Sequence, residues 1–174
     1  MQIKLVEVKS PLGGIEVAFH EHKNGDKVVG LEFADHRARL QKFMRRRFGA
    51  VTFVKTTRLS PAMRQVRDHV RAYFAGDIKA LDKIEVDLGG TPFQKQVWQQ
   101  LRRIRPGKTA SYGELARKVQ RPQASRAVGA ANGANPIALI VPCHRVIGSD
   151  GSLTGYAGGI DRKRWLLEHE AATR

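Results

Sequence analysis

Cysteine is nearly absent from this sequence, because Cys143 is the only one among 174 residues. A single cysteine excludes an internal disulfide, a thiol–disulfide redox pair within the chain and a zinc site built from several cysteines. Long apolar runs are missing too, since none approaches the roughly 18 residues that cross a membrane. Residues 1–7 do not resemble a secretory signal. We therefore expect a cytoplasmic protein, long enough for one good hydrophobic core or two small ones.

Acidic residues are also few, since 16 Asp and Glu stand against 31 Lys and Arg and the formal net charge is +15. Such a charge favours a polyanionic partner, and nucleic acid is the first candidate. Anionic lipid and a merely solvated basic surface are the alternatives. Divided at Gly90, the first part carries 17 basic and 11 acidic residues, and the second carries 14 and 5. The positive excess is therefore denser in the part that contains Cys143.

The residues beside Cys143 decide how its thiol is interpreted. An unperturbed cysteine is only roughly 3% ionised at pH 7, so a nucleophilic thiol needs help from a neighbour. His144, Arg145 or a histidine oriented by a carboxylate could supply that help. The alternative is a small buried apolar side chain, the commonest role of a lone cysteine. Residues 137–141 predict a buried strand, and Pro142 turns the chain sharply at its end, where functional sites are often found.

The first part of the chain reads as a mixed α/β domain. Its patterns predict strands at residues 3–8, 15–20, 28–33 and 51–54. They also predict helices at 35–48, with Asp35 as the cap, and at 61–74, with Ser60 as the cap and Pro61 at the first helical position. The Asn24-Gly25 dipeptide is typical of a hairpin turn. His20 and His22 would share a strand face, but without a third ligand we favour a solvated hairpin over a metal site. The arginines at 45–47 are interpreted as a solvated helix end that suits the helix dipole.

The second part reads as mainly helical. A glycine-containing linker near residues 76–90, with a short strand at 84–86, separates a domain at 1–85 from one at 86–174. Helices are expected at 92–104, 111–119, 124–132 and 161–170, the last capped by Asp161. Ser111 and Glu114 have the spacing of a capping box, and the second and third helices look like a helix-turn-helix. Helix 124–132 consists mostly of small residues, which suits either close approach to a groove or tight packing on a neighbouring helix.

Three classes of function fit a thiol beside a histidine in a strongly basic helix-turn-helix domain. The protein could be a cysteine hydrolase, a DNA-binding regulator with an incidental thiol, or a protein whose thiol reacts with nucleic acid itself. Only the third class uses the charge and the cysteine together.

Five motifs in this part resemble those of the O6-alkylguanine-DNA alkyltransferase family. They are Arg-Ala-Val-Gly at 126–129, Asn-Pro at 135–136, Pro-Cys-His-Arg-Val at 142–146, Gly-Tyr-Ala-Gly-Gly at 155–159 and Trp-Leu-Leu-Glu-His-Glu at 165–170. The resemblance covers residues 91–170. It implies an α/β fold with an N-terminal ribonuclease-H-like domain and a C-terminal, winged-helix-like helix-turn-helix domain. It also implies transfer of an alkyl group from O6-alkylguanine or O4-alkylthymine in DNA to a cysteine of the protein, once per molecule and without a cofactor.

The resemblance assigns the catalytic roles to four residues. Cys143 would accept the alkyl group, and His144 would act as its base through a bridging water. Glu170 would orient His144, and Asn135 would brace the turn between the recognition helix and the thiol segment. No metal is expected, because the N-terminal part lacks the cysteine cluster that forms the zinc site of some relatives. The methylphosphate-sensing domain of inducible regulators is absent for the same reason, so a gene-activating role is not expected.

The resemblance also implies a pocket for the flipped base. Tyr112 would hydrogen-bond the purine, and the backbone N–H of Ala157 would serve the departing oxygen. The carbonyls of Cys143 and Val146 would accept from the exocyclic amine, and Tyr156 would form a wall. Some members have a serine where this chain has Ala157, so here only the backbone donor is available.

Double-stranded alkylated DNA is the partner that the resemblance implies, bound through the minor groove without sequence preference. Arg126 would enter the duplex in place of the extruded base, and Ser125, Ala127 and Ala130 would lie against the groove. A degenerate minor-groove pattern suits an enzyme that must act in any sequence. We expect a monomer in solution that could bind DNA cooperatively, with no membrane association.

Overall fold

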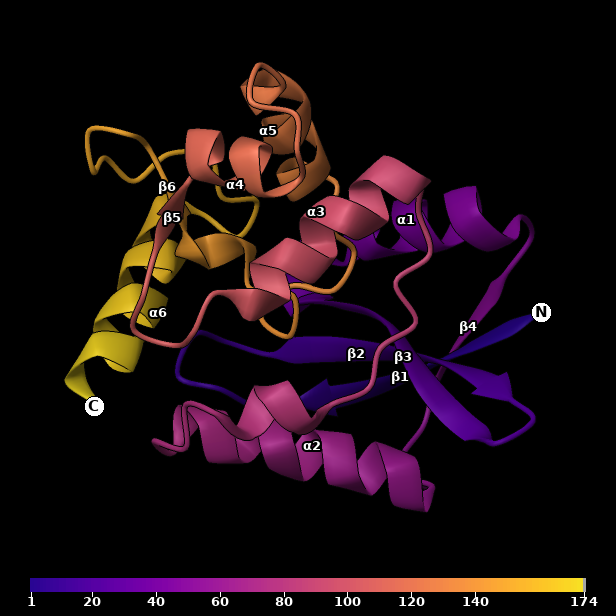
Figure 1. Ribbon diagram of the computed structural model, residues 1–174. Coiled ribbons are helices and arrows are strands. Elements are labelled where there is room, and N and C mark those ends of the chain that lie inside the picture. The colour runs from indigo at the N-terminus through magenta and orange to yellow at the C-terminus, as the bar shows by residue number, and fades with distance from the viewer. Residues whose placement is uncertain (174) are drawn as a thin grey trace. The chain divides into compact units, whose positions relative to one another are not determined.

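The computed structural model describes residues 1–173 and divides into two compact units, Met1–Gly89 and a second that begins at Gly90 (Figure 1). The first unit contains a sheet and helices, and the second is mainly helical. The predicted mixed α/β class is therefore confirmed. No helix among the described residues is long and apolar enough to cross a membrane.

The sheet of the first unit has four strands in the order β3-β2-β1-β4. These are β1 (Gln2–Val8), β2 (Ile15–His22), β3 (Gly25–Phe33) and β4 (Thr52–Lys55). The pairs β1–β2 and β2–β3 are antiparallel, whereas β4 runs parallel to β1. His22 pairs with Gly25, whose φ is 106°, so the hairpin predicted at Asn24-Gly25 is confirmed.

Helices cover both faces of this sheet (Figure 1). They are α1 (Arg37–Phe48) and α2 (Pro61–Phe74), with short 3-10 turns η1 (Ala34–His36) and η2 (Ala80–Lys83). α1 packs Leu40 and Met44 against apolar residues of β1, β2 and β3. Ser60 caps α2 by accepting a hydrogen bond from the Met63 N–H, with Pro61 at the first helical position, as predicted.

Two predictions in the first unit were wrong. Asp35 does not cap α1, because residues 34–36 form a 3-10 turn and the N-cap position belongs to His36. The strand expected at 84–86 is only a single bridge between Val86 and Val28, followed by an Asp87 N–H bond of 2.9 Å to the Val28 carbonyl. A segment with one such bridge cannot build a strand ladder of its own.

The second unit holds four helices and a two-stranded sheet among its described residues. They are α3 (Pro92–Arg103), β5 (Ala110–Ser111), α4 (Tyr112–Lys118), α5 (Ser125–Gly133), the 3-10 turn η3 (Cys143–Arg145), β6 (Val146–Ile147) and α6 (Ile160–Ala172). Capping boxes start α3 at Thr91 and α4 at Ser111, and the second confirms the sequence prediction. A turn at 119–124 joins α4 to α5, and the indole N–H of Trp98 on α3 holds α5 through the Ala131 carbonyl at 2.8 Å.

Residues 137–141 do not form the strand that the sequence predicts. They fold into buried turns, in which the Val141 N–H donates to the Ile137 carbonyl at 3.0 Å and Leu139 adopts a φ of 67°. An apolar run shows burial but not the partner strand that a sheet needs, and within this run only Ile137 takes part in a single β-bridge. Asp161 is not the cap of α6 either, because Gly159 holds that position and Asp161 lies in the first turn.

Candidate active site

The thiol of Cys143 follows a tight turn centred on Pro142. Pro142 has φ −82° and ψ 67°, and the Cys143 N–H donates to the Val141 carbonyl at 2.8 Å, which is the geometry of an inverse γ-turn. Asn135, which is buried, donates from Nδ2 to the same Val141 carbonyl at 2.8 Å and accepts from the Ile137 N–H at 3.0 Å. Cys143 is 8% exposed, so the thiol lies at the edge of the interior.

His144 lies in the same 3-10 turn and is fully buried. Its Nε2 lies 2.8 Å from Oε1 of Glu170 on α6, so the structure brings together two residues that are 26 positions apart. The ring of Tyr156 lies edge-on to the imidazole, with 6.5 Å between the centroids. Nδ1 of His144 makes no hydrogen bond with any described residue. The imidazole is therefore held from one nitrogen, and the other can still accept a proton.

Arg145 completes a buried ionic cluster around Glu170. Its Nε and Nη2 donate to the two carboxylate oxygens at 2.9 and 2.8 Å, and its Nη1 donates to the Ile104 carbonyl at 2.7 Å. Such a two-pronged pairing is the strong form of an arginine–carboxylate contact. The sequence suggested that Arg145 could assist the thiol, but the structure places its guanidinium on Glu170 instead.

The pKa values of this cluster follow from burial and pairing. Burial lowers the pKa of His144 and outweighs the carboxylate of Glu170, so the imidazole is neutral at pH 7. Burial alone would raise the pKa of Glu170, but its contacts with His144 and Arg145 hold that pKa well below its ordinary range. At neutral pH the pair is therefore a carboxylate that accepts from a neutral histidine.

Lys163 is a site residue that the sequence reasoning missed. It is fully buried on α6, and its ammonium donates to the carbonyls of Val146 and Thr154. Burial lowers the pKa of Lys163, and the charge of a Cys143 thiolate opposes that shift. The buried positions of α6 are Lys163, Leu166 and Glu170, with the three- and four-residue spacing of one helix face. Extending that face back from Glu170 would have found Lys163.

Tyr112 connects α5 to the glycine loop at 155–159. A Cβ added at Gly129 would lie 3.7 Å from the ring of Tyr112, and one added at Gly155 would lie 3.5 Å from its hydroxyl. Gly155 has a φ of 51°, which favours glycine. Ala157 lies in the same loop and is exposed. The structure therefore brings Tyr112 to the loop that contains Tyr156 and Ala157.

Helix α5 separates its small residues into two faces. Val128, Ala131 and Asn132 are buried, whereas Arg126, Ala127 and Ala130 are exposed and Ser125 is half-buried. The exposed face therefore offers a smooth strip of methyl groups with one arginine at its start. One face of the helix packs in the interior and the other is open, and contact of the open face with a groove stays a prediction.

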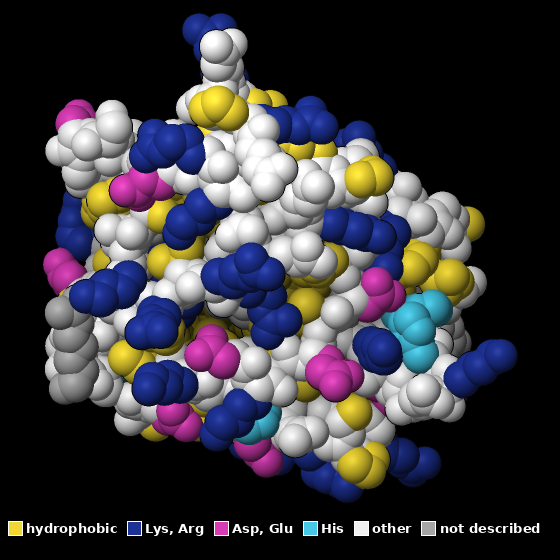
Figure 2. Space-filling view, in the orientation of Figure 1, with side chains coloured by type: hydrophobic (Ala, Val, Ile, Leu, Met, Phe, Trp, Pro, Cys, Tyr) yellow, Lys and Arg dark blue, Asp and Glu magenta, His cyan; other side chains and the backbone are white. Residues whose placement is uncertain are grey.

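Basic side chains are prominent on the face of the molecule that Figure 2 draws. Figure 2 shows lysine and arginine spread across the whole face in view, with fewer acidic groups between them. No group of three or more His, Cys, Asp or Glu side chains among residues 1–173 could hold a metal ion. His20 and His22 instead lie 3.3 Å apart between ring nitrogens, with His22 beside Asp87.

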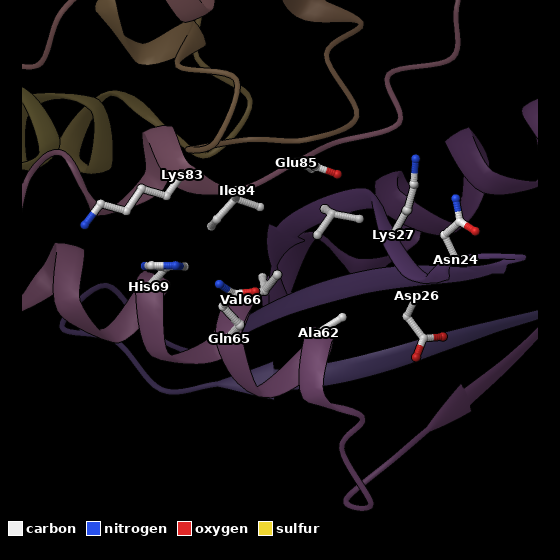
Figure 3. A pocket seen from close by; sticks show the side chains of 11 residues that line it. Asn24, Asp26, Lys27, Ala62, Gln65, Val66, His69, Lys83, Ile84 and Glu85 are labelled. Carbon is white, nitrogen blue, oxygen red and sulfur yellow. The ribbon is translucent and has the colours of Figure 1, made fainter.

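A cavity of about 280 Å³ lies in the first unit, between α2 and the β2–β3 hairpin. Polar and apolar residues line it, and Figure 3 shows Lys83 and His69 at one end with Asp26 and Lys27 at the other. Charges of both signs line it, so it offers a polyanion no net attraction. None of its lining residues belongs to the thiol site.

Comparisons with known proteins agree on the relatives of this chain. Residues 92–172 match the family model described as 6-O-methylguanine DNA methyltransferase, DNA binding domain. The chain is 44% identical over 170 residues to a methylated-DNA–protein-cysteine methyltransferase of Salmonella typhimurium, which covers 97% of this chain and 96% of that protein. A protein of the same name from Mycobacterium bovis is 60% identical over 103 residues, 59% of this chain and 62% of that one. The structure of Mycobacterium tuberculosis OGT in complex with DNA has a TM-score of 0.76 at 39% identity, covering 98% of this chain and 94% of that one.

Proposed function

Since the chain belongs to the methylated-DNA–protein-cysteine methyltransferase family, we propose that Cys143 is the residue that accepts the alkyl group. The protein is a DNA repair enzyme that acts by direct reversal, transferring the alkyl group of O6-alkylguanine in DNA to its own cysteine. The assignment depends on one observation. The only cysteine in the sequence directly precedes His144, and His144 pairs with Glu170 in the interior. Because the product is a thioether, which neither water nor a thiol cleaves at neutral pH, each molecule reacts once.

Activation of the thiol uses the neutral imidazole. The Nε2–H of His144 donates to Glu170, so Nδ1 is the accepting nitrogen and takes the thiol proton through a bridging water. Direct contact between consecutive side chains in a 3-10 turn is hard to achieve, which favours the water. Glu170 stabilises the imidazolium that forms, and the Arg145 fork keeps Glu170 ionised and in place. Asn135 holds the turn that presents the thiol.

Transfer is a displacement at the alkyl carbon. The Cys143 thiolate forms the new carbon–sulfur bond while the bond from that carbon to the guanine oxygen breaks, and the oxygen keeps the electron pair. Tyr112 and the Ala157 N–H stabilise this oxygen as it becomes the carbonyl of guanine, and N1 of the base takes up one proton, which balances the proton that the thiol lost. The carbonyls of Cys143 and Val146 accept from the exocyclic amine, and Tyr156 walls the pocket. The Val146 carbonyl already accepts from Lys163, but its second lone pair can serve the base.

Access to the alkyl carbon requires the base to leave the duplex, which costs a few kcal/mol and less for a damaged base. The exposed strip of α5 suits the minor groove, where Arg126 fills the space left by the base and Ser125, Ala127 and Ala130 lie against the groove walls. This proposal includes O4-alkylthymine as a second substrate and a monomer as the form that binds double-stranded DNA. It also includes a ribonuclease-H-like first domain and a winged-helix-like second one.

The proposal is tested by weighing the protein after incubation with a duplex that contains O6-methylguanine. We expect one methyl group per molecule, located on the peptide that contains Cys143, and none with the C143S variant. Repeated turnover, or a methyl group elsewhere in the chain, would contradict the assignment. A matching duplex with O4-methylthymine tests the second substrate in the same assay.

A further inference from the structure

One helix of the first unit carries a cluster of positive charge. Residues 1–89 contain 17 basic and 11 acidic side chains, and α1 alone contributes six basic and no acidic ones. Outside α1 there are 11 residues of each sign, but three of those 11 carboxylates pair with arginines of α1. What sets α1 apart is that several cations lie on one short helix, where a polyanionic partner could contact them together.

Half of the cations on α1 are neutralised within the unit. Arg37 pairs with Glu16, Arg39 with Glu32 at 2.6 Å, and Arg47 with Asp87 at 2.6 Å. The other three are Lys42, Arg45 and Arg46, which we call the basic stripe. All three are exposed, and no carboxylate of the described residues lies within 4.0 Å of them.

The basic stripe occupies one face of α1, because positions 42, 45 and 46 are three and four residues apart. Arg45 lies over the ring of Phe53, 5.3 Å from its centroid. A guanidinium that stacks on a ring is held in place and keeps its N–H edge for an anion. The negative end of the helix dipole is equivalent to only about half a charge. Interaction with that dipole therefore compensates only a small part of the positive charge of the three side chains.

We propose that the basic stripe binds the phosphodiester backbone of duplex DNA, as a second contact surface apart from helix α5. Three cations on one face, one of them held against a ring, match a row of phosphates, and they read no base sequence. A contact of this kind suits a protein that must search any sequence for damage. The inference rests on DNA being the substrate, but it makes no use of Cys143 or its neighbours.

The test compares K42Q/R45Q/R46Q with K23Q/R71Q/K79Q. The control variant removes the same charge from three exposed and unpaired cations elsewhere in the first unit. Glutamine favours helices, so α1 should persist, and circular dichroism and thermal melting check this. Binding to an unmodified duplex is measured over a range of salt concentrations. The logarithm of the affinity falls by roughly 0.9 per phosphate contact for each decade of salt, so one contact is worth about eightfold at 0.1 M.

We expect the stripe variant to lose two to three contacts from the salt slope, and therefore at least about sixtyfold in affinity at 0.1 M salt, and the control to lose less than one contact. Equal losses of affinity in both variants would overturn the proposal. No loss of affinity in either variant would also overturn it and would point to an acidic protein as the partner of the stripe. Methylation of Cys143 by free O6-methylguanine, which has no phosphate, should proceed equally in all three proteins. If wild-type protein gained no methyl group from damaged DNA, the proposed function would fail, and the binding comparison would still decide the role of the stripe.

Discussion

Replacing Glu170 by Gln perturbs the buried cluster with the least change in shape. The carboxylate accepts from His144 Nε2 at 2.8 Å, from Arg145 Nε and Nη2 at 2.9 and 2.8 Å, and from the Gly107 N–H at 3.4 Å. Glutamine keeps one acceptor oxygen but presents an NH2 group where the second oxygen stood. That NH2 group faces N–H donors of the cluster instead of accepting from them. Because glutamine is neutral, the buried guanidinium of Arg145 also loses its counter-charge.

Breaking one side of a buried ion pair costs about 3–5 kcal/mol, against the roughly 5–15 kcal/mol that holds a domain folded. We therefore expect E170Q to lose about 3–5 kcal/mol of unfolding free energy at pH 7. The pKa of Glu170 is depressed in the folded protein, so this stability is present above the ordinary pKa of about 4.3 and is lost as the pH falls below it. E170Q should lack that loss in acid.

Urea unfolding measures the stability, and the rate at which a disulfide reagent modifies Cys143 measures the thiol. In E170Q that rate should fall about 100-fold at pH 7, because His144 loses the group that orients it. The double variant R145M/E170Q removes both charges and should regain more than half of the lost stability, yet not the thiol reactivity. An unfolding free energy of E170Q within about 0.5 kcal/mol of wild type would refute the reasoning, because the cluster would then carry no net pairing energy.

Four further predictions follow from single side chains. His144 has a lowered pKa and stays neutral when folded, so stability should fall as the pH drops through the unfolded value of about 6.5; H144Q should flatten that part of a urea-derived stability curve. K163M should raise the pH at which the thiol becomes reactive, which a pH–rate profile for the disulfide reagent checks. It should also lower the unfolding free energy by roughly 1–3 kcal/mol in urea, because two carbonyls lose their donor. N135A should also cost about 1–3 kcal/mol in urea unfolding and slow methyl transfer, since the Val141 carbonyl loses a bond. Gln120 has a φ of 60°, so Q120G should raise the unfolding free energy by about 0.5–1 kcal/mol. L139G relieves a similar φ but should lower the unfolding free energy, because the buried Leu139 side chain is lost. Thermal melting distinguishes the two signs.

Local signals in the sequence predicted local structure well. The box at Ser111, the cap at Ser60 and the hairpin at Asn24-Gly25 each depend on groups within three or four residues of one another, and each was confirmed. The motif around Cys143 likewise identified the family, because a resemblance is carried by consecutive residues. The roles of the individual site residues stay predictions until they are tested.

Where the outcome depended on distant partners, the sequence was insufficient. The run at 137–141 was correctly predicted to be buried, but whether an apolar run pairs as a strand depends on a neighbouring strand, and here only Ile137 forms a single bridge. Asp35 and Asp161 were predicted to cap helices, yet the helix starts were set by a 3-10 turn and by Gly159.

The sequence by itself determined the composition of the site: one thiol, an adjacent histidine, a basic surface and a helix of small residues. Tertiary structure alone decided which charges are buried. Arg145 and Lys163 belong to residue types that normally face water, and the helical spacing of Lys163 from Glu170 is the one signal along the chain that points to either being interior. They are buried because folding brings Glu170 and the carbonyls of Ile104, Val146 and Thr154 to them, and a charge leaves water only where such partners replace it.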